Sequence, residues 1–416
     1  MKLWIKIIIA VIIPVMGFNF SSCAGGSGAG SSRQPGGVSS GNDSGSQGNY
    51  HVSSNTPSSP QSFNDITAAE LVSQMKLGWN LGNTLDASDL SWLGANASVS
   101  QLEGAWGNPV TTQANIDAIK NGGFDIIRIP VSWAKAANSN YIIRSDWMDR
   151  VTEVVNYAVN NDMYIVLNTH HDEGIFKFTN AAKTESLKAF RIIWEQIALN
   201  FKNYNEKLIF EGLNEPRTKG SSAEWNGGTS EERSILNEYY EIFVDIVRKS
   251  GGNNDKRVLM VNTYAASANS TAVNGLNVPP DTAANKIIVS IHAYAPYNFA
   301  LNQGSGSTDV WSISNSRDTS DIINALTPAY NKFVQNGIPV IMGEFGAVNR
   351  NNNDNARAAW AEYYTSQASQ RGIPCIIWDN GGFTGNGELF GFLNRSSNTF
   401  PFPGVLDALK RGAGVQ

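Results

Sequence analysis

The stretch that decides the fold is Ile287-Ile288-Val289-Ser290-Ile291, an almost continuous apolar run that is followed at once by His292 and Tyr294. A strand with one face in water alternates apolar and polar residues, whereas a strand of a parallel sheet is buried on both faces and is apolar nearly throughout. The run therefore predicts a parallel strand covered by helices, with polar side chains where the strand ends.

Seven further short runs of this kind occur along the chain, each bounded by turn residues. Helical patterns or long loops separate them, and in segment 146–161 the residues Val151, Val154 and Ala158 recur at the i, i+3, i+7 spacing of a helix face. Further helices are expected at 112–121 and near residues 195, 242, 330 and 362. The predicted strands are 77–81, 125–130, 163–168, 208–213, 258–262, 287–291, 340–343 and 375–378.

Eight parallel strands that alternate with helices predict an α/β fold, a single (β/α)8 TIM barrel with enlarged loops at the C-terminal face of its strands. A doubly wound open sheet is the alternative, but it commonly has a glycine-rich phosphate turn after its first strand. Gly78-Trp79-Asn80-Leu81-Gly82 has two glycines without that spacing, and the bulky Trp79 lies between them. The sequence therefore indicates no nucleotide site.

The N-terminus has the composition of an export signal. Lys2 and Lys6 precede the apolar run 7–20, which ends at small residues just before Cys23. This pattern predicts a lipoprotein-type signal peptide at 1–22 and a lipid on the Cys23 thiol. The protein would then be an exported, membrane-anchored bacterial lipoprotein, periplasmic or on the cell surface. The alternatives are an ordinary signal peptide with an incidental cysteine, or a membrane anchor, for which the run falls short of the roughly 20 residues of a spanning helix.

Residues 23–62 follow as a predicted tether. Gly, Ser, Asn, Gln and Pro dominate this segment, and such a composition cannot bury enough apolar surface to become ordered. The (β/α)8 domain is expected at 63–416. If Cys23 carries a lipid, Cys375 is the only cysteine left, so no intramolecular disulfide can form.

Charge and aromatic content narrow the choice of partner. The formal net charge of −5 argues against nucleic acid or an anionic membrane surface, because both require basic stripes. The 11 tryptophans and 13 tyrosines could pack on sugar rings, although we expect most of them in the core. A glycan is therefore the favoured partner, with membrane contact only through the lipid, and the domain is expected to be a monomer.

Polar side chains occur at the predicted carboxyl ends of the strands, where a packed barrel has no structural need for them. Any one of them could be an ordinary solvated loop residue. Because the strands are parallel, however, all of these side chains converge on one rim, which is where TIM barrels have their active sites. Strand by strand they are Asn80 and Asn83, Arg128, His170 and His171, Asn214 and Glu215, Tyr264, His292 and Tyr294, Glu344, and Trp378 and Asp379.

Two of these residues, Glu215 and Glu344, stand near the ends of the fourth and seventh strands. Two carboxyl groups on either side of a glycosidic bond are what glycoside hydrolysis requires: one protonates the leaving oxygen, and the other attacks or activates water. The other carboxylates fall beyond the strand ends in loops and rank second; they are Asp172, Glu173, Asp379 and Glu388.

Other hydrolytic chemistries have weaker support. A zinc hydrolase would also place imidazoles and carboxylates on a barrel rim, but the adjacent pair His170 and His171 cannot easily direct both rings at one ion, and no His-x-x-x-His spacing occurs. A serine hydrolase would need a Gly-x-Ser-x-Gly turn between a strand and a helix, and none of the eight predicted strands is followed by one. We therefore expect neither a metal nor another cofactor.

Short motifs at these strand ends resemble those of glycoside hydrolase family five, the cellulase family of TIM-barrel enzymes, over about residues 71–406. Two longer motifs, Gly-Trp-Asn-Leu-Gly-Asn-Thr-Leu-Asp at 78–86 and Trp-Gly-Asn-Pro-Val-Thr-Thr at 106–112, resemble its subfamily-four branch of endoglucanases, xyloglucanases and mixed-linkage glucanases. The short motifs are Ile-Arg-Ile-Pro at 127–130, Leu-Asn-Glu-Pro at 213–216, His-Ala-Tyr at 292–294, Gly-Glu-Phe-Gly at 343–346 and Trp-Asp-Asn-Gly at 378–381.

The resemblance implies a role for each matching residue. Glu215 corresponds to the acid/base and Glu344 to the nucleophile of a retaining mechanism, in which the two carboxyl groups lie about 5–5.5 Å apart. Arg128 and Tyr294 would hold Glu344 by hydrogen bonds, and Asn214 would bind the 2-hydroxyl of the sugar. The remaining residues would surround or support the substrate: His170, His171 and His292, with His292 near Glu215, Trp378 as a platform beneath the sugar, and Asn80 and Asn83.

The expected activity is hydrolysis of internal β-1,4 bonds in β-glucans such as cellulose, xyloglucan or mixed-linkage glucan, as in plant polysaccharide degradation. An endo-mannanase is an alternative. Another is a non-catalytic surface glycan-binding protein, but it would be expected to have lost Glu215 or Glu344, and both are present. The tolerated branches would depend on loop contacts near Trp92, Trp106, Asn226 and Trp311.

Overall fold

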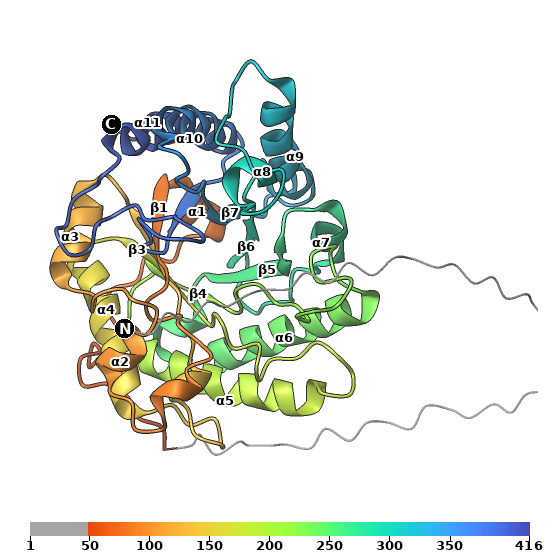
Figure 1. The fold of residues 1–416 in the computed structure, drawn as a ribbon. Coiled ribbons are helices and arrows are strands. Elements are labelled where there is room, and N and C mark those ends of the chain that lie inside the picture. The colour runs from red at the N-terminus through yellow and green to blue at the C-terminus, as the bar shows by residue number, and fades with distance from the viewer. Residues whose placement is uncertain (1–48) are drawn as a thin grey trace, which may run out of the picture. The chain divides into compact units, whose positions relative to one another are not determined.

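A closed barrel of eight parallel strands forms the centre of the fold (Figure 1). The computed structural model describes residues 49–416. Each strand pairs with its neighbours in sequence, and β1 closes the barrel against β8, so the predicted (β/α)8 barrel is confirmed. The strands are β1 (Leu77–Leu81), β2 (Ile126–Ile129), β3 (Tyr164–Asn168), β4 (Leu208–Glu211), β5 (Leu259–Ser267), β6 (Ile287–His292), β7 (Val340–Phe345) and β8 (Cys375–Asp379).

The crossover helices pack around the outside of the barrel, and α5 and α6 run side by side along one flank (Figure 1). The helix expected to be centred near residue 330 is present as Ser316–Lys332, and its centre lies a few residues earlier because Asn315 caps its start. The helices that follow successive strands are α3 (Gln113–Asn121), α4 (Ser145–Asn160), α5 (Lys183–Phe201), α6 (Ser230–Lys249), α7 (Ser270–Gly275), α9 (Ser316–Lys332), α10 (Asp354–Ser369) and α11 (Pro403–Ala413).

Shorter helices precede the barrel or lie within its loops. Thr67 caps the first of them with a reciprocal hydrogen bond to Glu70, a pattern readable as Thr-x-x-Glu. These helices are α1 (Ala68–Ser73), α2 (Val99–Glu103) and α8 (Tyr297–Ala300), together with the 3-10 turns η1 (Ser91–Leu93), η2 (Ala134–Ala136), η3 (Gly252–Asp255) and η4 (Val334–Asn336).

Helix α1 closes the amino-terminal end of the barrel. Its residues Leu71 and Val72 are buried among side chains that enter the barrel from the strands. The larger part of the core lies between the strands and the helices. The strand side chains that belong to the same buried cluster are Ile126, Val166, Ile209, Met260, Ile288, Ile341 and Ile376.

The carboxyl ends of three strands depart from regular pairing. Register shifts occur between Asn262 and Ser267, between Ile291 and His292, and before Phe345. Ala265 and Ala266 have positive φ angles there, which lengthens β5 beyond its predicted end at residue 262. Such irregularities re-aim the side chains beside them, and they lie at the rim where the polar residues were predicted.

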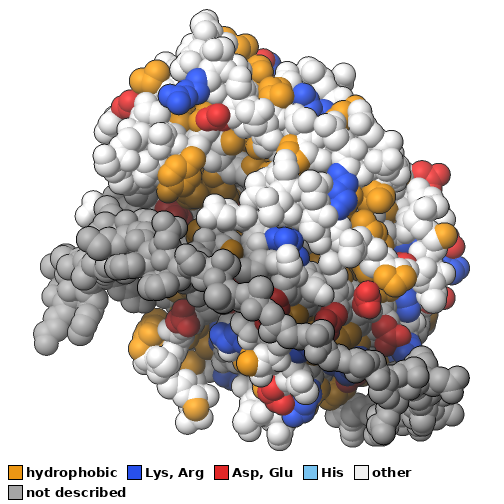
Figure 2. Space-filling view, turned by 90° about the vertical axis from the view of Figure 1, so that its right-hand side faces the viewer, with side chains coloured by type: hydrophobic (Ala, Val, Ile, Leu, Met, Phe, Trp, Pro, Cys, Tyr) orange, Lys and Arg blue, Asp and Glu red, His pale blue; other side chains and the backbone are white. Residues whose placement is uncertain are grey.

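The surface has mixed charge. On the face drawn in Figure 2, Lys and Arg side chains lie among Asp and Glu side chains rather than in one basic stripe. Within residues 49–416, none of the helices has the length and apolar content needed to cross a lipid bilayer. The predicted signal peptide at 1–22, the lipidated Cys23 and the first part of the tether lie outside the described residues.

The last part of the predicted tether, residues 49–62, packs against the barrel helices. The backbone N–H of Ser53 donates to Asn200 at 2.8 Å, and both residues are buried. The Tyr50 hydroxyl donates to Glu195 at 3.1 Å, and the Gln61 backbone donates to the carbonyl of Asn203 at 2.8 Å. The ordered domain thus begins before residue 63, because hydrogen bonds rather than apolar burial hold this polar segment.

This contact generates a prediction about truncation. Removing residues 1–48 should leave the melting temperature unchanged, whereas removing 1–62 should lower the free energy of unfolding by about 1–3 kcal/mol, since Asn200 and its neighbours lose their partners. Both truncated proteins should keep their activity on soluble substrate. Denaturant titration of the two proteins, compared with the full chain, measures the difference. Equal stability of the two would mean that segment 49–62 contributes nothing.

Candidate active site

A buried arginine lies at the centre of the carboxyl-terminal rim. Arg128 on β2 is fully buried, and its Nε donates to Glu211 at 2.7 Å. Its Nη1 donates to Asn80 at 3.0 Å and to Glu344 at 2.8 Å, and its Nη2 donates to Asn214 at 2.7 Å. Burial alone would lower the pKa of Arg128, but the two carboxylates outweigh it and raise that pKa. Arg128 is therefore a fixed positive charge inside the barrel.

Glu211, the last residue of β4, is fully buried beneath the rim. Besides Arg128, its carboxylate accepts hydrogen bonds from Asn168 at 3.0 Å and from Asn262 at 2.9 Å. The sequence interpretation missed all three of these residues. A signal was present, since Glu211 is the one charged residue in the run 208–213, and Asn168 and Asn262 end predicted strands.

Glu344 on β7 accepts hydrogen bonds at both carboxylate oxygens. Arg128 donates to Oε1, and the Tyr294 hydroxyl donates to Oε2 at 2.9 Å. Burial, and next the charge of Glu344, raise the pKa of Tyr294 well above its ordinary value, so the phenol keeps its proton. Donors on both oxygens stabilise a carboxylate and fix its plane.

Glu215 follows β4 and faces Glu344. His292 Nδ1 lies 3.1 Å from Glu215 Oε1 and 3.7 Å from Glu344 Oε1, and one oxygen of Glu215 lies within 4.8 Å of an oxygen of Glu344. Arg217 Nη1 lies 3.3 Å from the other oxygen of Glu215. Loss of hydration raises the pKa of Glu215, but His292 and Arg217 outweigh this effect and lower it. The spacing fits the short separation of a retaining pair and is too small for an inverting pair.

Three aromatic side chains form one wall of the site. The rings of His170 and Trp378 are parallel, with an interplanar angle of 2° and centroids 5.9 Å apart. His171 lies edge-on to His170 at 4.4 Å. A Cβ on Gly82 would stand 2.7 Å from the Trp378 ring, so only glycine lets the chain pass beneath that indole. The wall provides the flat apolar surface that a sugar ring requires.

The two histidines differ in charge. Burial, and then the neighbouring His171, lower the pKa of His170 well below its usual value, so this ring is neutral. Burial also opposes the charge of His171, but Glu173 at 3.5 Å outweighs it and raises the pKa of His171. In turn the pKa of Glu173 falls to about 2, because His171 and then Lys219 outweigh its burial.

Comparison with known proteins agrees with this geometry. Residues 88–384 match the family described as Cellulase (glycosyl hydrolase family 5). The chain belongs to glycosyl hydrolase family 5. Endoglucanase A of Clostridium longisporum is 44% identical over 360 residues, which cover 86% of this chain and 68% of that protein.

Solved structures of family 5 have the same barrel. A GH5-4 broad specificity endoglucanase from Ruminococcus champanellensis with bound cellotriose is 48% identical with a TM-score of 0.80, covering 84% of this chain and 99% of that one. A GH5 family lichenase from Caldicellulosiruptor sp. F32 is 40% identical with a TM-score of 0.80, covering 88% of this chain and 100% of that one. The protein is an endo-β-glucanase of this family.

Several predicted rim residues of this family 5 enzyme hold loops or other side chains instead of facing the cleft. Asn80 is fully buried and orients Arg128. Asn83 has a φ of 54° in a turn, where its backbone N–H donates to Asp86. The Tyr264 hydroxyl donates to Glu232 on α6 at 2.8 Å and accepts from the backbone N–H of Thr218 at 3.0 Å, which anchors the loop after β4.

The lower-ranked carboxylates also have identifiable partners. Asp379 is the last residue of β8 and accepts hydrogen bonds from the Trp79 indole and from the Leu393 backbone. Asp172 accepts from the backbone of Trp133, and burial raises the pKa of Asp172 to about 6. Of the tryptophans whose loops were expected to contact substrate branches, Trp311 is buried and Trp92 is 67% exposed.

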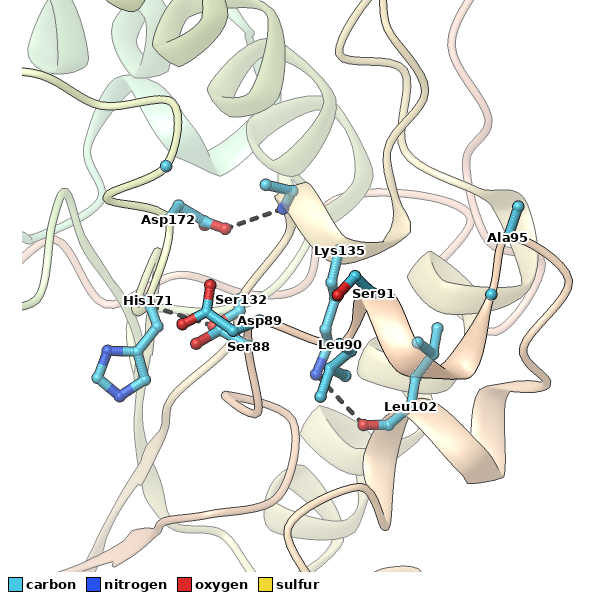
Figure 3. A pocket seen from close by; sticks show the side chains of 13 residues that line it. Ser88, Asp89, Leu90, Ser91, Ala95, Leu102, Ser132, Lys135, His171 and Asp172 are labelled. Atoms are coloured by element: carbon cyan, nitrogen blue, oxygen red, sulfur yellow. Dashed lines mark hydrogen bonds between the residues drawn. The ribbon is translucent and has the colours of Figure 1, made fainter. Parts of the chain in front are cut away.

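Two cavities extend the cleft beyond His171. They have volumes of about 350 Å³ and 450 Å³ and share Ser88, Asp89, His171 and Gly174 in their walls. Figure 3 shows the smaller one, where the loop carrying Ser88 and Asp89 lies opposite Asp172 and Lys135. The walls of both cavities combine polar and apolar surface, as a binding site for a sugar chain requires.

Two sets of side chains in the enzyme have the donor types of a metal site. In the set that contains Glu344, the guanidinium of Arg128 already donates to an oxygen of Glu344, and a second cation there would be repelled. In the set that contains Asp86, the carboxylate of Asp86 accepts hydrogen bonds from two backbone N–H groups. Hydrogen bonds within the protein thus account for these carboxylates. The sets are Glu215, His292 and Glu344, and Asp86, His170 and His171.

The Arg128 cluster generates a prediction about stability. Arg128→Leu should lower the free energy of unfolding by about 3–5 kcal/mol, because Glu211 becomes a buried charge without a partner. Arg128→Leu combined with Glu211→Leu should recover most of that loss, since the unpaired charge is gone. Arg411→Leu, which breaks an exposed pair with Glu362, is the control and should have no measurable effect. An equally unstable double variant would contradict the assignment.

Proposed function

We propose that the protein cleaves internal β-1,4 bonds of β-glucans with net retention, using Glu215 as acid/base and Glu344 as nucleophile. The observation that carries the proposal is the unequal environment of the two carboxylates. Glu344 accepts hydrogen bonds from a fixed cation, Arg128, and from the Tyr294 hydroxyl, so it is oriented as an anion. Glu215 lies within reach of His292 at the open side of the site.

The first step transfers the sugar to the enzyme. Glu215 donates its proton to the glycosidic oxygen while Glu344 attacks the anomeric carbon, and the aglycone leaves. The side-chain oxygen of Asn214 accepts from Arg128, which leaves the amide nitrogen free to donate to the 2-hydroxyl of the bound sugar. That contact strengthens as positive charge develops on the sugar.

The second step releases the sugar. Glu215, now a carboxylate, accepts a proton from water, and the water oxygen attacks the anomeric carbon from the face opposite Glu344. His292 and Arg217 stabilise the carboxylate form of Glu215 that serves as the base in this step. Glu344 departs as a carboxylate, again stabilised by Arg128 and Tyr294. Two inversions give net retention.

The proposed substrates are cellulose, xyloglucan and mixed-linkage glucan. The solved relatives include one with bound cellotriose and a lichenase, which supports an unsubstituted glucan chain as the core of the substrate. The cavities beside His171 provide room along this chain. Mannan cleavage remains a second candidate, and the stacked Trp378 platform is compatible with it because either sugar presents an apolar face.

A reducing-sugar assay on a panel of β-glucans and mannan tests the activity, and variants of the two carboxylates test the roles. Glu215→Ala should barely hydrolyse glucan but should still form the glycosyl-enzyme from an aryl glycoside with an acidic phenol, and azide should then yield the β-glycosyl azide. Glu344→Ala should fail on the aryl glycoside, and anions should rescue it only to an α-configured product. An α-azide from Glu215→Ala would reverse the assignment.

We also propose that the enzyme is exported and anchored by a lipid on Cys23, in the periplasm or at the cell surface. The support is the sequence alone: two lysines, an apolar run and a cysteine after small residues. Such an anchor holds the protein at the membrane without contributing to the barrel. A monomeric enzyme on a tether would act on glucan chains near the cell.

The lipid anchor is tested by Cys23→Ala in a bacterial host that processes lipoproteins. The variant should leave the membrane fraction, because the acyl chains are its attachment, while kcat/KM on soluble glucan stays unchanged. Fractionation after cell lysis, followed by an activity assay of both fractions, measures this. A variant that stays with the membrane would exclude Cys23 as the anchor.

A further inference from the structure

Arg217 contacts the predicted acid/base directly. It follows Glu215 by two residues, and the sequence interpretation did not single it out. Its Nη1 donates to the backbone carbonyl of Glu215 at 2.9 Å and lies 3.3 Å from the carboxylate oxygen Oε2. His292 Nδ1 lies near the other oxygen, Oε1. The Glu215 carboxylate is thus held between one group from β6 and one from its own loop.

Other contacts fix the guanidinium of Arg217. Its Nε donates to Glu224 at 3.1 Å, and its Nη1 lies 3.5 Å from Glu173. The guanidinium also lies over the ring of Trp225, 4.7 Å from the ring centroid. The Arg217 side chain is only 9% exposed. A planar cation held on several sides cannot turn away from Glu215, so its charge acts at a constant position.

We propose that Arg217 is a positioning residue that fixes the carboxyl group of Glu215 and sets the pH range in which this group carries its proton. This inference rests on the proposed function, because it takes Glu215 to be the acid/base. The contacts of Arg217 are with carboxylates and an indole, and its contact in the catalytic pair is Glu215. It acts through Glu215.

The charges around Glu215 have opposite effects. Cationic Arg217 and the histidines stabilise its anionic form, whereas the carboxylates of Glu344 and Glu388 oppose it. The guanidinium of Arg217 also contacts Glu173 and Glu224, and both of these carboxylates weaken the effect of Arg217 on the pKa of Glu215. The titratable or charged groups that face Glu215 are Arg217 from its own loop, His292 on β6, His171 after β3, Tyr294 after β6, Glu344 on β7 and Glu388 after β8.

The direction in which Arg217 shifts the pH profile of activity follows from the role of Glu215 as the acid. Cleavage of an unactivated glucan needs protonated Glu215, so kcat/KM falls as the pH rises through the pKa of Glu215. Arg217 lowers that pKa and therefore places the alkaline limb of the pH profile at a lower pH. Removing the charge should move this limb to higher pH. An opposite charge within contact distance lowers a carboxyl pKa by about 1–3 units, so a shift of about one pH unit is the expected size.

The test is the pH profile of kcat/KM on β-glucan for Arg217→Gln, Arg217→Lys and the unchanged enzyme. Arg217→Gln should move the alkaline limb up by about one pH unit, and Arg217→Lys, which keeps the charge, should return most of the shift. With an aryl glycoside that carries an acidic phenol, the rate of first phenol release should show no such shift, because that step needs no acid. Arg411→Gln is the matched control, since its exposed side chain pairs with Glu362 far from the site.

A second variant keeps the test decisive if Arg217→Gln does not fold. Glu224→Gln removes one competing carboxylate from Arg217 but keeps an acceptor for its Nε, so it should move the alkaline limb to lower pH. An unmoved limb in a folded Arg217→Gln enzyme, or an upward shift in Glu224→Gln, would overturn the inference.

Failure of the proposed function would give a different result from failure of the inference about Arg217. If Glu215→Ala kept full activity on glucan, the acid/base assignment itself would be wrong, whatever the profile of the Arg217 variants. If Glu215→Ala lost activity as expected but the limb of folded Arg217→Gln stayed in place, only the role of Arg217 would be wrong. Glu215→Ala therefore belongs in the same experiment.

Discussion

The guanidinium of Arg128 lies between two carboxylates, Glu211 and Glu344, in a part of the barrel that water does not reach from below. One positive charge cannot neutralise two negative ones, so the remaining stabilisation must come from dipoles. Asn168 and Asn262 supply it on the Glu211 side. This requirement explains several of the polar strand ends, each of which contributes a donor or an acceptor to the buried charge network: Asn80, Asn168, Glu211, Asn262 and Glu344.

The same network explains the stiffness that catalysis requires. A nucleophile must keep its oxygen aligned with the anomeric carbon to within a fraction of an ångström. Donors on both oxygens of Glu344 prevent its carboxylate from rotating. Gly343, just before it, has its own constraint, because an added Cβ would stand 2.9 Å from the ring of His292. The backbone and its neighbours thus leave Glu344 one position.

Sequence reasoning located all eight strands because a parallel barrel buries both faces of each strand, and this leaves a clear apolar run. It also pointed to the rim, because polar groups follow all eight strands, although one such group alone could be a solvated loop residue. It could not find the partner of Glu211, because one charged residue in an apolar run does not say which distant strand neutralises it. It did not show that Tyr264 and Trp311 would be buried, because burial in long loops depends on how the loops fold. It also placed the end of the tether too late, because the hydrogen bonds of a polar segment leave no pattern in its composition.

Helix α1 closes the amino-terminal end of the barrel with Leu71 and Val72, so in the described domain the charge network communicates with solvent through the rim alone. A glucan chain that fills the cleft covers that rim. Substrate at the rim and α1 at the other end would then separate the buried ions from bulk water on both sides. Exchange of protons with the solvent is therefore expected chiefly in the empty cleft, between the release of one product and the binding of the next chain.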